Sequence, residues 1–115
     1  MTNYAHGHDA EKYAARWLQE QGYKIIALNW RDRRAEIDII ARRQQGPLRF
    51  IEVKYRETAE QGGGFDYITP AKQRQMAFAA ELYVAKTRYT GEYTLAALEV
   101  SGLDYGVTGF IEEIT

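Results

Sequence analysis

Two neighbouring segments rich in strand-forming residues constrain the fold of this chain most. They are AEIDIIA (35–41) and LRFIEVKY (48–55), and the linker between them contains the turn-forming residues Gly46 and Pro47. In both segments hydrophobic side chains alternate with polar or charged ones, which is the two-residue period of a β-strand. Strands separated by a short linker of turn residues commonly pair side by side. The sequence therefore predicts an antiparallel hairpin at the centre of a sheet.

Helices and further strands are predicted on both sides of this hairpin. A helix is expected from Asp9 to Gly22, because hydrophobic residues recur there at helical spacing. Thr69 and Pro70 are typical of a helix start and predict a second helix that runs to about Lys86. Three further strands are expected at residues 24–30, 93–100 and 107–114. This order of elements indicates an α/β fold in which a mixed sheet is flanked by helices on its faces.

The length and composition indicate one domain. The chain has 115 residues, of which 45% are hydrophobic, and this is enough for one core but too few residues for two ordinary domains. We therefore expect a single domain over residues 1–115, with residues 1–6 flexible. Residues 57–66, which include three consecutive glycines, lack periodicity and are expected to form a mobile loop.

The charge balance and the absence of cysteine limit the functional classes. The 15 Lys and Arg residues nearly balance the 16 Asp and Glu residues, so any binding of nucleic acid has to come from a local basic patch. The sequence has no cysteine, which excludes a disulfide framework and a thiolate metal site. It also lacks a signal-peptide pattern and a membrane-spanning stretch, and we therefore expect a cytoplasmic protein without membrane contact.

Three charged residues of the hairpin are predicted to share one face of the sheet. Glu52 and Lys54 of the second strand point one way, while their hydrophobic neighbours point toward the core. Pairing of the hairpin can bring Asp38 of the first strand beside Glu52. Two carboxylates repel one another unless a cation lies between them, and their oxygen atoms suit Mg²⁺ or Mn²⁺. Such an ion can activate water against a phosphodiester, and Lys54 could position that water.

Glu11 and a group of basic residues extend this candidate site. Glu11 lies at the edge of the hydrophobic stripe of the first predicted helix and can lean toward the sheet. Arginines are concentrated near both ends of the hairpin, and two cations begin the second helix, a distribution that suits a polyanion held over a metal. The basic residues are Arg31, Arg33, Arg34, Arg42, Arg43, Arg56, Lys72 and Arg74.

Each of these features also has a purely structural interpretation. Glu52 and Lys54 would form a solvated strand face on which Asp38 makes a weak ion pair. Glu11 would be a first-turn acid favoured by the helix dipole. The basic residues would be a solvated rim that keeps the protein soluble. The E-x-K motif alone favours this interpretation, whereas the position of Asp38 between two core-type isoleucines argues against it.

Short motifs follow one another along most of the chain. They are Glu11, N-W-R (29–31), A-E-I-D-I-I (35–40), E-V-K-x-R (52–56), a glycine-rich loop and I-T-P-x-K (68–72). In this order they closely resemble the YraN family, also called UPF0102. That family is similar to the PD-(D/E)XK nuclease superfamily and, in its core, to archaeal Holliday junction resolvases. The resemblance implies a restriction endonuclease-like fold.

The resemblance also implies roles for individual residues. Asp38 and Glu52 would hold Mg²⁺ or Mn²⁺, the Val53 carbonyl would complete the shell, and Lys54 would assist the water. Glu11 would be an additional ligand or would orient the water. Phosphate contacts are expected from Arg34 in the arginine cluster and, by the resemblance, from Arg56 and Lys72.

The sequence leaves three functions open. The first is a metal-dependent nuclease that acts on DNA, with selectivity for the structure of the DNA as one option, and that grips its substrate with a partner or as a homodimer. The second is a nucleic-acid-binding or assembly module that keeps the nuclease fold without turnover, and the third is a protein-binding domain. The chain departs from the family pattern at Ala10, Ala35 and T-L-A (94–96). None of these positions belongs to the proposed triad of Asp38, Glu52 and Lys54. These departures and the near-neutral charge keep the second function open.

Overall fold

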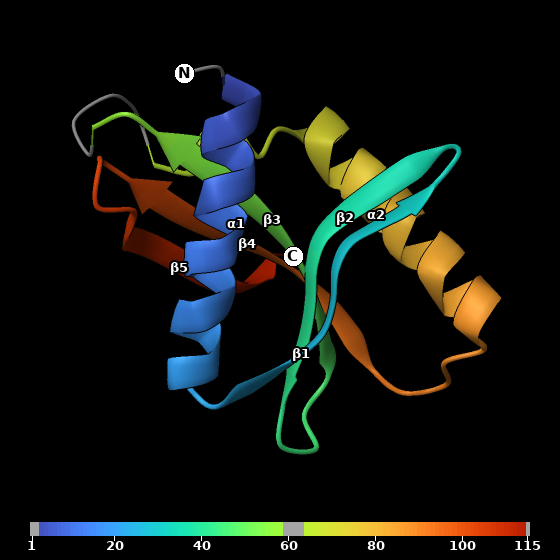
Figure 1. Cartoon of the computed structure of the whole chain (residues 1–115). Helices are drawn as coiled ribbons and strands as arrows, with labels where there is room; N and C mark the ends of the chain where they lie inside the picture. The colour runs from blue at the N-terminus through green and yellow to red at the C-terminus, as the bar shows by residue number, and fades with distance from the viewer. Residues whose placement is uncertain (1–2, 59–63, 115) are drawn as a thin grey trace.

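The computed structural model describes residues 3–58 and 64–114 and contains a five-stranded mixed sheet with a helix on each face (Figure 1). The strand order is β1-β2-β3-β4-β5, with β3 and β4 parallel and the other neighbours antiparallel. The predicted α/β class and the hairpin are therefore confirmed, and the arrangement is consistent with a restriction endonuclease-like fold. The elements are α1 (Asn3–Glu20), β1 (Tyr23–Asp32), β2 (Ala35–Arg43), β3 (Leu48–Arg56), α2 (Pro70–Thr87), β4 (Tyr93–Ser101) and β5 (Gly106–Ile114).

The first helix differs most from its predicted bounds. α1 begins at Asn3 instead of Asp9, so residues 3–6, which were expected to be flexible, are helical. Gly7 lowers local helix propensity by about 1 kcal/mol relative to alanine. A helix that is already formed nevertheless gains one hydrogen bond for each residue added, which favours extension. Residues 1–2 and residues 59–63 of the expected mobile loop lie outside the described residues.

Helix α2 provides the crossover that two parallel neighbouring strands require. Thr69 has an extended backbone, and its hydroxyl oxygen accepts a hydrogen bond of 3.1 Å from the backbone N of Lys72. Pro70 follows as the first helical residue, where its missing N–H leaves no helical hydrogen bond unmade. The predicted start of this helix is therefore confirmed. The helix ends before Arg88, which has a left-handed backbone with φ 57°.

Two hydrophobic clusters hold the helices on opposite faces of the sheet. The adjacent residues Ile39 and Ile40 of β2 are fully buried, Ile39 in the cluster with α1 and Ile40 in the cluster with α2. In β3, Ile51 belongs to the first cluster and Phe50 to the second. Complete burial of one such side chain contributes about 1.5–3 kcal/mol. The middle of the sheet is therefore hydrophobic on both sides.

Strands β2 and β3 separate before either strand ends. Their ladder stops at the pair Ile39 and Ile51, whereas β2 remains paired with β1 as far as Ala35. The next position on each strand is an acid, Asp38 on β2 and Glu52 on β3. The early separation of the two strands therefore opens the sheet where both acids lie.

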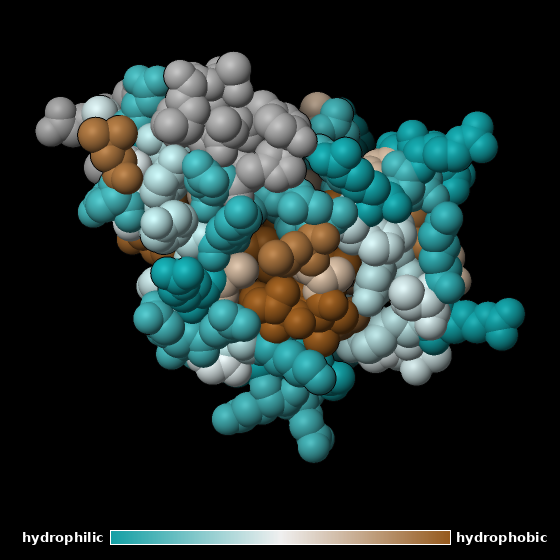
Figure 2. Space-filling model, in the orientation of Figure 1, coloured by the Kyte–Doolittle hydropathy of each residue, from teal (hydrophilic) through white to brown (hydrophobic). Residues whose placement is uncertain are grey.

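The end of the β1–β2 hairpin reaches over α2 (Figure 1). Lys86 Nζ near the end of α2 lies 2.7 Å from Asp32 Oδ2 at the end of β1, which fixes this arrangement. β1 is an edge strand, and its Ile26 and Leu28 are 41% and 44% exposed. Figure 2 shows a hydrophobic area, bordered by hydrophilic residues, in the middle of the face that β1 crosses. Among the described residues, no helix combines the length and hydrophobicity that a membrane span needs.

Candidate active site

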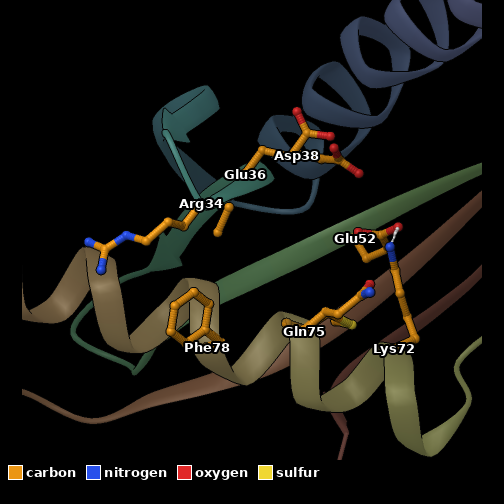
Figure 3. A pocket seen from close by; sticks show the side chains of 9 residues that line it. Arg34, Glu36, Asp38, Glu52, Lys72, Gln75 and Phe78 are labelled. Atoms are coloured by element: carbon orange, nitrogen blue, oxygen red, sulfur yellow. Dashed lines mark ion pairs between the residues drawn. The ribbon is translucent and has the colours of Figure 1, made fainter.

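A cleft of about 300 Å³ lies where β2 and β3 separate, with α2 as its other wall (Figure 3). It contains both acids predicted from the hairpin and two of the cations predicted to contact phosphate. The hydrophobic part of the lining comes mainly from α2. The lining residues are Arg34, Ala35, Glu36, Asp38, Glu52, Lys72, Gln75, Met76 and Phe78.

The backbone of β3 holds Asp38 in place. Asp38 lies one step beyond the last ladder pair of β2 and β3, which puts it opposite Glu52 as the sequence predicts. Its Oδ2 accepts a hydrogen bond of 2.8 Å from the backbone N of Val53. A buried backbone N–H needs an acceptor, and the carboxylate replaces the main-chain oxygen that the departing strand no longer offers. The position of this acid is therefore a consequence of the separation of the strands.

Two carboxyl groups near the cleft have strongly raised pKa values. The pKa of Asp38 is raised to about 8, first by burial and then by the charge of Glu52, although the hydrogen bond from Val53 opposes the rise. The pKa of Glu11 is raised to about 7, mainly by burial, although a hydrogen bond with the side chain of Asn29 opposes the rise. Oε1 of Glu11 is buried and has no hydrogen-bond partner in the described part of the chain. Both groups therefore favour either a proton or a nearby cation.

Glu52 already has a cation beside it. Lys72 reaches from the first turn of α2 to the carboxylate of Glu52 on β3, as Figure 3 shows. Its Nζ lies 2.9 Å from Glu52 Oε2, and the two side chains are 33% and 23% exposed. Lys72 was predicted to contact phosphate, and the structure places it at the cleft with its ammonium group bound to an acid.

Lys54 lies beside the cleft, outside its lining. Its Nζ is 5.5 Å from the centre of the Tyr67 ring, a distance typical of a cation–π contact. Lys54 and Glu52 share a face of β3, as predicted from the alternation. The predicted triad is therefore arranged as two acids facing each other and a lysine next to them under an aromatic ring.

Arg56 is bound within the protein. Its Nε lies 2.9 Å from Glu99 Oε2, and its NH2 donates a hydrogen bond of 2.9 Å to the Gly64 carbonyl. The Arg56 side chain is 17% exposed and lies over the same Tyr67 ring at 5.7 Å. These contacts show that Arg56 anchors the turn before α2. Its predicted contact with phosphate would require this network to open.

The turn from residue 64 to residue 67 brings Tyr67 onto the two cations. The backbone N of Ile68 donates to the Phe65 carbonyl at 2.9 Å, and the Phe65 ring lies over Gly109 of β5. A Cβ atom at Gly109 would be 3.0 Å from that ring, so this close approach depends on glycine. The Tyr67 hydroxyl is buried and has no hydrogen-bond partner among the described residues.

The remaining arginines divide between the two ends of the β2–β3 hairpin. At the cleft end, Arg34 is exposed and pairs with Asp32 at 3.2 Å, and Arg31 pairs with Glu36 at 3.4 Å. At the turn end, Arg42 and Arg43 make contacts that lie far along the strand from the acids. These contacts are Arg42 Nε with the Gly46 carbonyl at 2.7 Å and Arg43 with Glu112 at 3.7 Å and the Tyr23 ring at 5.0 Å. Of the predicted phosphate contacts, Arg34 and Lys72 line the cleft.

The sequence did not reveal the positions of two residues near the acids. Asn29 lies in β1 with a left-handed backbone, φ 51°, and its side chain interacts with Glu11. An asparagine inside a hydrophobic strand segment was the available signal, because this residue tolerates the left-handed region. The second residue is Tyr67, whose ring contacts Lys54 and Arg56. Burial raises the pKa of its hydroxyl, as do the charges of Glu52 and Glu99, so it remains a hydrogen-bond donor.

The oxygen atoms of the acids near the cleft suit a hard cation, but the acids are not gathered closely enough to bind one as they stand. Two facing acids, a raised pKa at Asp38 and an unpartnered oxygen on Glu11 are features that a divalent ion would satisfy. Across residues 3–58 and 64–114, no three His, Cys, Asp or Glu side chains are gathered closely enough to hold a metal. The carboxylate of Glu52 is instead bound to the ammonium group of Lys72. Metal binding at this site would therefore require Glu52 to change its partner.

Comparisons with known proteins agree with the order of motifs. The model of the uncharacterised protein family UPF0102 matches residues 10–100. A UPF0102 protein of Lachnoclostridium phytofermentans is 44% identical over 88 residues, which cover 76% of this chain and 74% of the relative. A UPF0102 protein of Ralstonia nicotianae is 39% identical over 103 residues, covering 87% and 78% of the two chains. The matched segment includes Glu11, both acids of the cleft and Lys72, and the chain belongs to the uncharacterised protein family UPF0102.

Proposed function

We propose that the cleft is the active site of a metal-dependent nuclease that hydrolyses phosphodiester bonds in DNA. The observation that carries this proposal is the pair of facing acids, Asp38 and Glu52, at the point where two core strands separate. Burial makes the ionised form of Asp38 unfavourable. An acid with a purely structural role at the surface would not be placed in such an environment, whereas active-site acids often are. Cations at the mouth of the same cleft, Arg34 and Lys72, could hold a polyanion over these acids.

The chain offers a ligand set for Mg²⁺ or Mn²⁺. Asp38 and Glu52 would bind the ion, with the Val53 carbonyl and Glu11 as further oxygen donors. When bound, such an ion polarises the phosphodiester and lowers the pKa of water. Lys54 would orient that water or stabilise charge on the phosphate, and the Tyr67 ring keeps the lysine at the edge of the cleft.

One observation favours the alternative of a nucleic-acid-binding or assembly module without turnover. Glu52 is neutralised by Lys72, and no three metal-binding side chains are gathered in the described ranges. In that case Arg34 and Lys72 would bind nucleic acid through phosphate. The binding would weaken with salt and would not respond to a chelator.

A cleavage assay with matched variants distinguishes these functions. The purified chain is incubated with linear, single-stranded and branched DNA in Mg²⁺ or Mn²⁺, beside Asp38→Ala and Lys54→Ala. The nuclease proposal predicts cleavage by the wild type that both substitutions and a chelator abolish. Absence of cleavage, or cleavage that survives either substitution, contradicts it. Chelator-insensitive binding that is lost in Arg34→Gln and Lys72→Gln supports the alternative.

Location and assembly remain part of the proposal. A cytoplasmic protein without cysteine would meet DNA in a reducing compartment. The small open cleft of a single chain would grip a duplex more firmly in a homodimer. Light scattering of the purified chain with and without branched DNA would measure how many protein chains associate. One protein chain per particle in both samples would exclude the homodimer.

A further inference from the structure

Lys72 stands at a position where a helix normally disfavours a cation. It lies in the first turn of α2, and its backbone N donates to the capping Thr69 at 3.1 Å. The N-terminus of a helix carries a partial positive charge, so acids are preferred in the first turn. The first turn of α2 contains no acid. The unfavourable placement of Lys72 is offset by one contact, the ion pair with Glu52 at 2.9 Å (Figure 3).

The cleft holds two facing acids, and only one of them has this counter-charge. Lys72 contacts Glu52, while Asp38 on the opposite strand accepts a hydrogen bond from the backbone N of Val53. The charge of Glu52 still raises the pKa of Asp38. One ammonium group therefore neutralises the acids incompletely, and a divalent ion placed between them would do so more fully.

We propose that Lys72 is a built-in counter-cation of Glu52 that a divalent ion displaces, so that metal binding frees the ammonium group for a phosphate of the substrate. This rests on the proposed function, because it takes Glu52 to be a metal ligand. Lys72 is a positioning residue before metal binds and a phosphate-binding residue afterwards. The metal and the nucleic acid are thereby coupled through a single side chain.

The geometry supports an exchange of partners. An ion coordinated by Glu52 at about 2.1 Å would lie close to an ammonium group 2.9 Å from the same carboxylate, and the two positive charges would repel. The lysine side chain has a flexible four-carbon stem and is 33% exposed, so it can turn outward. Its attachment to α2 keeps it at the mouth of the cleft, where a phosphate would lie.

Metal affinity measures the exchange without requiring catalysis. Mn²⁺ binding to the full chain is measured by electron paramagnetic resonance and calorimetry in the wild type, Lys72→Gln and Lys24→Gln. Lys24 is an exposed residue of β1, so its substitution makes the same change in net charge away from the cleft. We expect Lys72→Gln to bind Mn²⁺ about 3- to 10-fold more tightly and Lys24→Gln to stay within about 2-fold of the wild type. Lys72→Arg, which keeps the ion pair, should resemble the wild type.

The outcomes separate this inference from the proposed nuclease. Equal Mn²⁺ affinity in the wild type and Lys72→Gln, with both variants folded by circular dichroism, overturns the exchange and leaves the metal site standing. Tighter binding in both glutamine variants alike also overturns it, because net charge alone then explains the effect. Absence of Mn²⁺ binding in the wild type and in Lys72→Gln overturns the metal site together with the exchange.

A second measurement follows the freed ammonium group. In the Lys54→Ala background, where turnover is expected to be absent, Mn²⁺ should increase the affinity for a short duplex. Adding Lys72→Gln should reduce this increase by at least about 3-fold, because coupling between two ligands is reciprocal. An increase of equal size with and without Lys72 overturns the proposed release toward phosphate.

Discussion

Two ion pairs on β3 illustrate how differently the same chemistry can be used in this protein. Arg56 and Glu99 form a pair whose side chains are 17% and 8% exposed, and Glu99 Oε1 also accepts a hydrogen bond of 2.8 Å from Thr108. The pair of Lys72 and Glu52 is more exposed, and residues 3–58 and 64–114 add no comparable network to it. The first pair therefore behaves as part of the fold. The second can exchange a partner, which is what a binding site requires.

The largest expected effect comes from breaking the enclosed pair. Arg56→Met leaves the Glu99 carboxylate buried without its cation and removes the anchor of Gly64, so we expect the free energy of unfolding to fall by about 3–5 kcal/mol. Urea denaturation measures this. The matched control is Arg34→Met, where the arginine side chain is 62% exposed and the loss should stay below about 1 kcal/mol. Asp32 keeps Lys86 as a second cation in this control. Similar losses in both variants would remove the distinction between an enclosed arginine and an exposed one.

The next effect concerns Asp38, which forms no ion pair with a cation among the described residues. Its pKa is raised from 3.8 to about 8, so the unfolded chain loses this proton at lower pH than the folded chain does. Stability should therefore fall as the pH rises from about 4 to about 8. Asp38→Asn keeps an oxygen for the Val53 N–H without the charge, and at pH 8 we expect it to be about 1–3 kcal/mol more stable than the wild type.

Urea denaturation of both proteins at pH 5 and pH 8 tests the role of Asp38. The difference between the two proteins should grow with pH, and added Mg²⁺ should stabilise the wild type more than Asp38→Asn. Parallel pH profiles for the two proteins would show that the Asp38 carboxyl group is not the source of the dependence.

A smaller effect is expected for the exchangeable pair. Lys72→Gln removes a partly exposed ion pair and also a cation from the first turn of a helix, and these two changes oppose one another. We expect the free energy of unfolding without metal to change by less than about 1 kcal/mol. Thermal and urea denaturation measure it. A loss as large as that of Arg56→Met would place Lys72 among the structural residues.

The smallest expected change in stability is at Tyr67. Tyr67→Phe keeps the ring over Lys54 and Arg56 and removes a buried hydroxyl without a partner, so stability should change by less than about 1 kcal/mol. If the hydroxyl donates to substrate, DNA cleavage should fall by about 10-fold while the fold stays intact. Tyr67→Leu removes the ring as well and should reduce cleavage further. Equal activity in the wild type and Tyr67→Phe would assign the role to the ring alone.

Local patterns were sufficient to predict the elements and the position of the acids. Alternation in the hairpin placed Asp38 opposite Glu52, and Thr69 with Pro70 marked the start of α2. The strand pattern did not show that the hairpin ladder ends just before these acids. Its early end depends on the β1–β2 hairpin reaching over α2, which is a tertiary contact that the strand pattern does not contain.

The partners of the cations could not be predicted for a related reason. Arg56 meets Glu99 because β4 lies parallel to β3, with Lys54 in register with Glu99, and this depends on the crossover through α2. Lys72 meets Glu52 only when the start of α2 is placed over β3. Both cations were predicted, from the resemblance to the family, to contact phosphate. Charge is visible in a sequence, but the distance to a buried counter-charge is a property of the folded sheet.

Gly109 extends the candidate site to the far edge of the sheet. The Phe65 ring occupies the space that a side chain at position 109 would fill, and the same turn carries the tyrosine that contacts Lys54. A single added methyl group on β5 would crowd the Phe65 ring, and the turn that holds this ring also holds Tyr67 over Lys54. Gly109→Ala should lower activity more than global stability, and paired assays of cleavage and unfolding would detect that difference. Gly109 therefore matters to the candidate site because it has no side chain, which leaves room for the Phe65 ring.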